Sequence, residues 1–290
     1  PVHFGGVEGR VEATGRGVQF GLQEFFRNPD DVLSAKLEGS LTGKKIIIQG
    51  LGNVGYHAAK FLQEEDGACI IAIIERDGAI INESGLDVEE VSKYKSEYGK
   101  VEGFPDSKFV KNGKDVLEHS CDILIPAAME GVITQENAPR IQAKVIAEAA
   151  NGPVTYEGDQ ILNEKGTFII PDAFLNAGGV TVSYFEWLKN LSHVRFGRMD
   201  RRFIEAQGQK IIEAIESGIG KSLDQTAKNK LLEGPSELDL VRSGLEDTMR
   251  VAYAEVKEQQ LSNSKINDRR TAAYALAISK ISDIYESMYL

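Results

Sequence analysis

A glycine-rich turn near residue 50 constrains the fold of this chain more than any other feature of its sequence. Residues 50–55 read Gly-Leu-Gly-Asn-Val-Gly, a complete GxGxxG pattern. The apolar run 46–48 precedes the turn, and a helical pattern over residues 54–65 follows it. A GxGxxG turn between a buried strand and a helix is typical of dinucleotide-binding domains. The alternative is an ordinary glycine-rich turn, which the surrounding strand and helix disfavour.

Each glycine of this turn has a distinct expected role. Gly50 permits the tight turn, Gly52 lets the backbone approach a pyrophosphate, and Gly55 lets the helix pack closely on the strand. The N-terminus of the following helix offers free N–H groups and a partial positive charge to the anion. The turn therefore predicts a pyrophosphate site.

The choice of dinucleotide depends on the end of the second apolar run. Glu75 lies twenty positions beyond Gly55, where a carboxylate accepts hydrogen bonds from the ribose 2′-hydroxyl of NAD and repels the 2′-phosphate of NADP. Arg76 follows it, and a guanidinium can pair with that phosphate. We therefore expect NAD, with NADP as the open alternative.

Short apolar runs alternate with helical patterns between residues 41 and 190. The runs of strand length are 46–48, 69–74, 123–125, 145–147 and 168–170. Helical patterns cover 54–65 and 88–98. Buried strands separated by helices indicate a parallel sheet that is covered on both faces. We predict an α/β fold, a doubly wound parallel sheet of the Rossmann type, over residues 41–190.

The rest of the chain favours helices. Residues 1–40 form an N-terminal segment with a helix that Thr14 caps and that ends near Arg27. Residues 191–235 are a charged helical extension, and residues 236–290 hold two stronger helices. The sequence thus predicts an all-helical C-terminal region after the sheet.

Composition excludes several classes of protein. The 33 Lys and Arg residues face 44 Asp and Glu residues, a net charge of −11, which argues against a nucleic-acid binder. No apolar run approaches the roughly 20 residues that cross a bilayer, so we expect no membrane association. Cys69 and Cys121 lie in or beside apolar stretches without metal-ligand spacing, which favours buried, reduced thiols and no metal site.

Polar residues follow three of the expected strands. These stretches are 126–128, 148–153 and 171–179. In open α/β sheets ligands bind beyond the carboxyl ends of the strands. Small residues there let a nicotinamide ring lie against the backbone, and the side chains of Asn151 and Asn176 can donate to a carboxamide or a carboxylate. The alternative for both asparagines is turn chemistry near glycine.

Several of these stretches resemble the glutamate dehydrogenases. Residues 176–187, Asn-Ala-Gly-Gly-Val-Thr-Val-Ser-Tyr-Phe-Glu-Trp, are very similar to the corresponding stretch of that family. The other similar stretches are 9–10, 13–17, 50–55, 150–153 and 270–274. The resemblance spans essentially the whole chain, with the motifs in the family's order.

The resemblance implies a role for each matching position. The residues implied to contact the dinucleotide are Thr14 and Ala127 at the nicotinamide end, Asn53 and Val54 through their backbone at the pyrophosphate, and Glu75 at the adenosine ribose. Asn151 and Asn176 would border both the nicotinamide and the amino-acid head. Arg10 would hold the substrate side of the cleft, and Ser183 would hydrogen-bond the side-chain carboxylate of glutamate.

The resemblance also implies the reaction, the oxidative deamination of L-glutamate to 2-oxoglutarate and ammonium with hydride transfer to the nicotinamide. In this family the catalytic lysine and its aspartate partner belong to an N-terminal domain that no segment here matches. We therefore expect no catalytic residue in this chain and no turnover by the chain alone. Family members are hexamers, which implies a homo-hexamer, in the cytoplasm or the mitochondrial matrix. The 191–235 extension resembles in placement the helical antenna of the animal enzymes.

Two alternatives stay open. Leucine and phenylalanine dehydrogenases share the scaffold, although the Asn-Gly-Pro turn at 151–153 and Ser183 are more similar to the glutamate enzyme. A non-catalytic dinucleotide sensor explains the glycine-rich turn and Glu75. It does not explain why Arg10, Ser183 and the two asparagines would gather at the nicotinamide.

Overall fold

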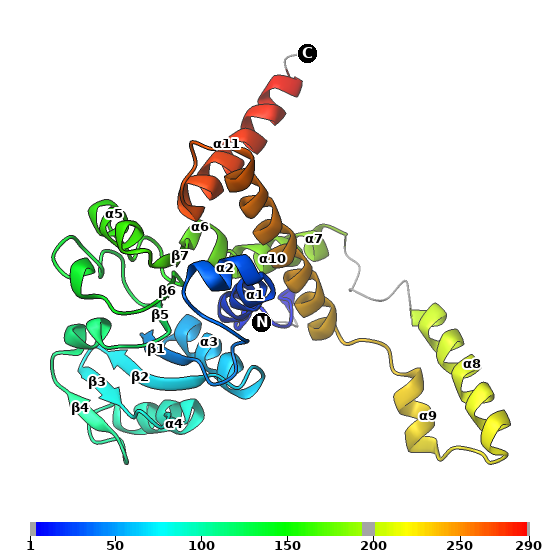
Figure 1. Cartoon of the computed structure of the whole chain (residues 1–290). Helices are drawn as coiled ribbons and strands as arrows, with labels where there is room; N and C mark the ends of the chain where they lie inside the picture. The colour runs from blue at the N-terminus through cyan, green and yellow to red at the C-terminus, as the bar shows by residue number, and fades with distance from the viewer. Residues whose placement is uncertain (1–3, 193–200, 289–290) are drawn as a thin grey trace. The chain divides into compact units, whose positions relative to one another are not determined.

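The computed structural model describes residues 4–192 and 201–288, and these form two compact units (Figure 1). One unit comprises Pro1–Arg10 and Thr181–Leu245, and the other comprises Val11–Val180 and Glu246–Leu290. The division at residues 40, 190 and 235 that the sequence suggests stays a prediction.

The second unit contains a seven-stranded sheet with the order β4-β3-β2-β1-β5-β6-β7. The strands are β1 Lys45–Gln49, β2 Cys69–Glu75, β3 Gly78–Ile81, β4 Lys108–Val110, β5 Ile123–Pro126, β6 Val145–Ala147 and β7 Phe168–Ile170. The pairs β2–β1, β1–β5, β5–β6 and β6–β7 are parallel. All five predicted strands are present, and the predicted α/β fold is confirmed.

One edge of the sheet differs from the prediction. β3 pairs antiparallel with both β2 and β4, so the sheet is mixed rather than wholly parallel. The chain reverses through Arg76 and Asp77. The Asp77 carboxylate then accepts the backbone N–H groups of Val101 and Glu102 at 3.0 and 3.1 Å. β3 and β4 were not predicted because their strand character comes from pairing with β2 and with each other.

Helices cover both faces of the sheet, as the doubly wound prediction requires. The helices of the chain are α1 Ala13–Arg27, α2 Pro29–Ser34, α3 Asn53–Glu64, α4 Val88–Tyr98, α5 Tyr156–Lys165, α6 Asp172–Leu175, α7 Gly178–Ser192, α8 Arg201–Ile219, α9 Gln225–Leu232, α10 Glu237–Ser262 and α11 Arg269–Met288. Two 3₁₀ helices, η2 Gly113–Glu118 and η3 Ala138–Arg140, pack with α5 on one face of the sheet. On the other face α3 contacts β1 and β2, and α1 lies on α3.

The start of α1 corrects one prediction. Thr14 is not the N-cap, because the helix begins at Ala13 with Glu12 at its N-cap and no side-chain cap bond. Thr14 lies instead in the first turn. A glycine in the same turn sets the packing of this helix, since a Cβ at Gly15 would lie 2.6 Å from the Cβ of His57 on α3. Only a glycine lets the two helices approach so closely.

The two thiols differ in environment. Cys121 is buried, as predicted, and burial raises the pKa of its thiol to about 12. Cys69, at the start of β2, is only half-buried, so the prediction that both thiols are buried is wrong for this residue. Both cysteines are free.

The charged extension contains α8 and α9, as predicted, while residues 193–200 of it lie outside the described residues. Within the first unit these two helices pack on each other. Glu216 of α8 stabilises the turn between them: it pairs with Lys228 at 2.8 Å and accepts the N–H of Leu223 at 2.8 Å. Among the described residues, no helix combines the length and apolar character needed to cross a bilayer.

Candidate dinucleotide site

The sheet order creates a switch point beside the glycine-rich turn. From β1 the chain continues to β2 on one side, whereas β5 pairs with the other side of β1. Loops that leave the two strands therefore diverge, which opens a crevice at their carboxyl ends. The turn at 50–55 follows β1 directly and leads into α3, so it lies at the switch point.

The three glycines meet different surroundings. A Cβ at Gly55 would lie 1.8 Å from the carbonyl oxygen of Gly50, so only glycine lets α3 begin so close to the turn. Gly50 has a φ of +89°, and a Cβ there would lie 2.6 Å from the Cβ of Ala128. Gly52 meets nothing within 4 Å. Open space above Gly52, at the N-terminus of a twelve-residue helix, is suited to an anion such as a pyrophosphate.

Glu75 ends β2 and points to the turn. Its Oε1 atom accepts the N–H of Leu51 at 2.5 Å and the ammonium of Lys95 at 2.7 Å. Lys95 also donates to the carbonyl of Leu51 at 3.1 Å. Arg76, the residue proposed from sequence to meet a 2′-phosphate, is exposed in the hairpin turn.

Lys95 is a candidate site residue that the sequence reasoning missed. It lies in the last turn of α4, twenty positions beyond Glu75. The sequence predicts the bounds of this helix, but its weak amphipathic pattern does not show which lysine faces the glycine-rich turn. The ion pair places one positive charge next to the carboxylate that would read the ribose.

The strand ends bring two predicted residues together. The amide of Asn176, which follows α6, donates to the side-chain oxygen of Asn151 at 2.7 Å. Ala127 is half-buried beyond β5, and its N–H donates to the carbonyl of Gln49 in β1 at 2.8 Å. An amide pair at the carboxyl ends of β6 and β7 can present both a donor and an acceptor to a carboxamide.

Three further predicted residues lie where α1 meets α3. The side chain of Asn53 donates to the carbonyl of Val11 at 2.7 Å, which ties the glycine-rich turn to the segment entering α1. Val54 is half-buried in the first turn of α3, and Thr14 is half-buried in the first turn of α1. The side chain of Asn53 is thus engaged, and its backbone N–H at the start of α3 is the group proposed for a ligand.

Arg10 and Ser183 belong to the other unit. Arg10 is half-buried in a turn, and Ser183 is half-buried on α7. Their predicted roles toward a substrate stay predictions.

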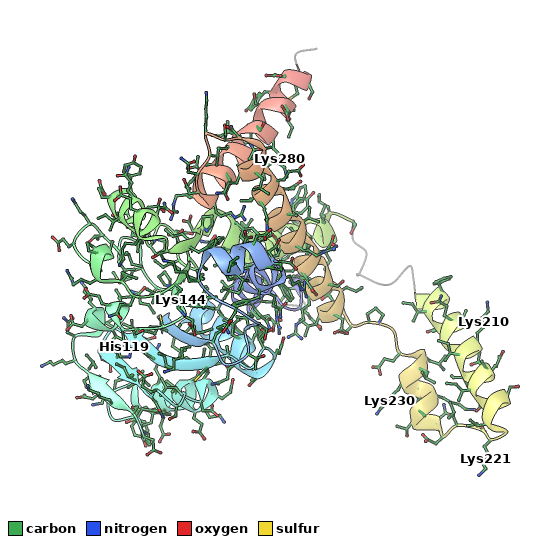
Figure 2. All side chains as sticks on the ribbon, in the orientation of Figure 1. His119, Lys144, Lys210, Lys221, Lys230 and Lys280 are labelled. Atoms are coloured by element: carbon green, nitrogen blue, oxygen red, sulfur yellow. The ribbon has the colours of Figure 1, made fainter. Side chains whose placement is uncertain are left out.

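The described histidines have local partners. His57 on α3 bonds the carbonyl of Asn53 at 2.7 Å, and His119 pairs with Glu83 at 2.7 Å on the surface (Figure 2). His3 and His193 lie outside the described residues. Among the residues that the structure covers, no group of three His, Cys, Asp or Glu side chains is arranged to hold a metal ion.

A GxGxxG turn at the switch point of a doubly wound sheet, with an acidic residue ending the neighbouring strand, defines a dinucleotide-binding α/β protein of the Rossmann class. The chain belongs to the Glutamate/Leucine/Phenylalanine/Valine dehydrogenase family, whose sequence model matches residues 5–229. Membership of this family implies a nicotinamide cofactor.

Individual relatives agree with this assignment. The chain is 48% identical over 287 residues to the "Glutamate dehydrogenase, mitochondrial" of Dictyostelium discoideum, with 99% of the chain and 57% of that protein covered. It is 45% identical over 286 residues to the "Probable glutamate dehydrogenase" of Sinorhizobium fredii, with 98% and 64% covered. The chain therefore spans only about three fifths of the length of these relatives.

A solved structure supports the fold. The hetero-hexameric glutamate dehydrogenase of Thermus thermophilus, solved in a leucine-bound form, has a TM-score of 0.72 and 24% sequence identity, with 98% of this chain and 55% of that chain covered.

Proposed function

We propose that this chain is the nicotinamide-dinucleotide-binding part of a glutamate dehydrogenase. The observation that carries the proposal is the open space above Gly52 at the N-terminus of α3, next to a Gly55 that packs too closely for any side chain. The names of the two relatives described above support glutamate as the substrate. Leucine and phenylalanine dehydrogenases, which the family also includes, are the alternative.

In the proposed mechanism, the residues of this chain bind the dinucleotide and orient its nicotinamide toward the substrate. A bound nicotinamide supplies the hydride acceptor for oxidation at the Cα of L-glutamate, which leads to 2-oxoglutarate and ammonium. The N–H groups at the start of α3 hold the pyrophosphate, and Glu75 accepts a hydrogen bond from the adenosine ribose. The amides of Asn151 and Asn176 border the nicotinamide, while Arg10 and Ser183 serve the substrate.

The chain by itself is expected to bind dinucleotide without turning over glutamate, because we assign no proton-transferring residue to it. The measurement is glutamate-dependent NADH formation by the purified chain, followed at 340 nm, with the complete protein as the positive control. Deamination by the chain alone would show that a catalytic group lies within these 290 residues.

The Glu75–Lys95 pair suggests how the two dinucleotides are distinguished. Glu75 favours NAD through the ribose hydroxyl, whereas Lys95 offers a charge to a 2′-phosphate. We propose NAD as the principal cofactor. NADP is also accepted in this proposal, because the charge of Lys95 partly neutralises the Glu75 carboxylate that would otherwise repel the 2′-phosphate.

Substitutions at these positions are expected to change the preference in opposite directions. Glu75→Gln should raise the ratio of NADPH affinity to NADH affinity by roughly tenfold, and Lys95→Gln should lower the same ratio by roughly tenfold. Each change is of the size expected for the loss of one charged hydrogen bond. Calorimetric titration of the chain with NADH and NADPH measures both. The matched control is Arg76→Gln in the exposed turn, which should leave the ratio unchanged. A change of the ratio with Arg76→Gln alone would move the phosphate contact to Arg76.

The assembly and the compartment are proposals as well. The Thermus thermophilus enzyme is described as hetero-hexameric, which supports an assembly of six subunits. We propose that six identical subunits of the complete protein form it here. The cytoplasm is proposed as its compartment, with the mitochondrial matrix as the alternative that the name of the Dictyostelium relative supports.

A further inference from the structure

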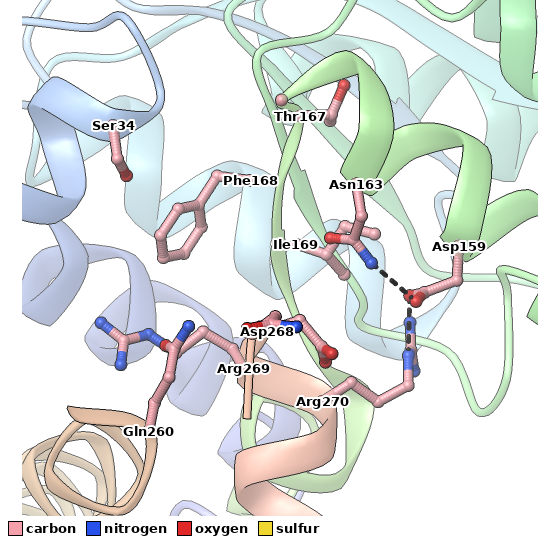
Figure 3. A pocket seen from close by; sticks show the side chains of 12 residues that line it. Ser34, Asp159, Asn163, Thr167, Phe168, Ile169, Gln260, Asp268, Arg269 and Arg270 are labelled. Atoms are coloured by element: carbon pink, nitrogen blue, oxygen red, sulfur yellow. Dashed lines mark hydrogen bonds and ion pairs between the residues drawn. The ribbon is translucent and has the colours of Figure 1, made fainter. Parts of the chain in front are cut away.

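A buried ion pair lies at the carboxyl ends of β6 and β7. Glu148, directly after β6, has no exposed surface. Arg270, in the first turn of α11, donates to both of its carboxylate oxygens, from Nη1 at 2.9 Å and from Nη2 at 2.8 Å. The Nε atom of Arg270 donates to Asp159 of α5 at 2.8 Å (Figure 3). A fully buried carboxylate is unstable without such a partner, so Arg270 determines whether Glu148 remains charged there.

A chain of hydrogen bonds leads from this pair to the two asparagines. Glu148 also accepts the backbone N–H of Asp172 at 2.9 Å. Asp172 in turn accepts the N–H of Gly152 at 2.7 Å, and its other oxygen lies 3.6 Å from Arg270. Gly152 directly follows Asn151, whose side chain accepts the amide of Asn176. The loops after β6 and β7 are thus held to each other and to Arg270.

The neighbouring arginine provides a contrast. In Figure 3 the side chains of Arg269 and Arg270 point in different directions, to opposite sides of a cavity of about 250 Å³. Arg269 pairs with Asp31 at 2.7 Å, and this ion pair joins α11 to α2. Arg270 alone of the two reaches the strand ends.

We propose that Arg270 is a positioning residue for the nicotinamide: through Glu148 and Asp172 it fixes the loops that carry Asn151 and Asn176. The inference rests on the proposed function, in which these two amides border the ring. A carboxamide needs a donor and an acceptor at set positions, and loss of the arginine fork frees both loops. Residues 270–274 resemble the glutamate dehydrogenases without an implied role, and the proposal gives a role to the first of them, Arg270.

The test separates the nicotinamide end of the ligand from the rest. Arg270→Lys keeps the charge but loses the fork geometry. We expect it to weaken NADH binding by roughly tenfold, and the binding of ADP-ribose, which lacks the nicotinamide, by less than about twofold. Calorimetric titration of the 290-residue chain with both ligands gives the ratio of the NADH affinity to the ADP-ribose affinity. A merely structural role would weaken both ligands alike.

A second variant guards against loss of the fold. If Arg270→Lys does not fold, Glu148→Gln combined with Arg270→Gln removes both charges together, and the same unequal loss is expected. This choice follows from Glu148 itself: burial raises the pKa of its carboxyl, against the opposing effect of Arg270, so the neutral form is the better tolerated one without the arginine.

Two controls come from the same helix. Lys280 of α11 pairs with Glu255 on the surface (Figure 2). Arg269 pairs with Asp31 of α2. Lys280→Gln and Arg269→Lys should leave the ratio of the two affinities unchanged.

The outcomes distinguish the two proposals. Parallel losses of NADH and ADP-ribose in the Arg270 variants, or a changed ratio in either control, would overturn the role of Arg270 while the proposed function stands. If the unsubstituted chain binds neither ligand, the proposed function fails, and this inference fails with it.

Discussion

Gly55→Ala is expected to destabilise the second unit by about 3 kcal/mol or more, the upper range for overpacking a tight contact. The added methyl would lie 1.8 Å from the backbone carbonyl oxygen of Gly50. The position of a Cβ is fixed by its own backbone, so no side-chain rotation can relieve the contact. α3 must therefore move off the glycine-rich turn. Urea unfolding followed by circular dichroism measures the loss, and NADH binding should disappear with it.

Gly52→Ala is the matched control within the same turn. Its φ of −84° and ψ of −164° suit any residue, and nothing lies within 4 Å of the added methyl. Its urea midpoint should stay unchanged, whereas its NADH affinity should fall by at least about tenfold, because the methyl occupies the space proposed for the pyrophosphate. If Gly52→Ala binds NADH normally, the pyrophosphate does not lie above this residue. If Gly55→Ala is as stable as the unsubstituted chain, the fold does not need the close approach of α3 to the glycine-rich turn.

The central strands and their helices could be predicted because each carries its own signal. Ile46, Ile47 and Ile48 are fully buried, and a continuous apolar run reports burial on both faces of a parallel sheet. α4 has the predicted bounds for a similar reason. Asp87 caps its first turn by accepting the N–H of Glu90, and Gly99 ends it in the left-handed conformation.

The sheet edge and the first turn of α1 could not be predicted in this way. β3 and β4 are strands because they pair with β2 and with each other, not because of a period in their own residues. Thr14 is a good N-cap by residue type, yet α1 begins at Ala13, with Glu12 at the N-cap and no side-chain cap bond. Packing against α3 sets the position of this helix, and tertiary contacts override local preference.

The candidate site shows the same division. The glycines of the turn and Glu75 form a local pattern with a fixed spacing, so a single sequence suffices to propose them. Lys95 and Arg270 act through partners in other elements, and Arg270 is 122 positions away from Glu148. Such a pair leaves no spacing to recognise, since the fold alone brings the two charges together.

Asp31→Ala is expected to destabilise the second unit by about 3–5 kcal/mol, as for breaking a buried ion pair from one side. The Asp31 carboxylate is 6% exposed and accepts from Arg269 at 2.7 Å and from the hydroxyl of Tyr253 at 2.6 Å. Lys257 lies 3.4 Å away. Without the carboxylate, Arg269 keeps a buried charge whose Nε and Nη1 atoms already lack hydrogen-bond partners. The free energy of unfolding in urea measures the effect.

Asp30→Ala is the matched control, since Asp30 is the preceding residue of α2 and is exposed. It should lose only the charge–dipole stabilisation of a helix N-terminus, about 0.3–1 kcal/mol. Combining Asp31→Ala with Arg269→Met should restore much of the stability, because the buried charge leaves together with its partner. Equal losses for Asp30→Ala and Asp31→Ala would mean that Arg269 is not left as an uncompensated buried charge when the Asp31 carboxylate is removed. In that case the packing of α2 on α1, and not this carboxylate, holds α2 in place.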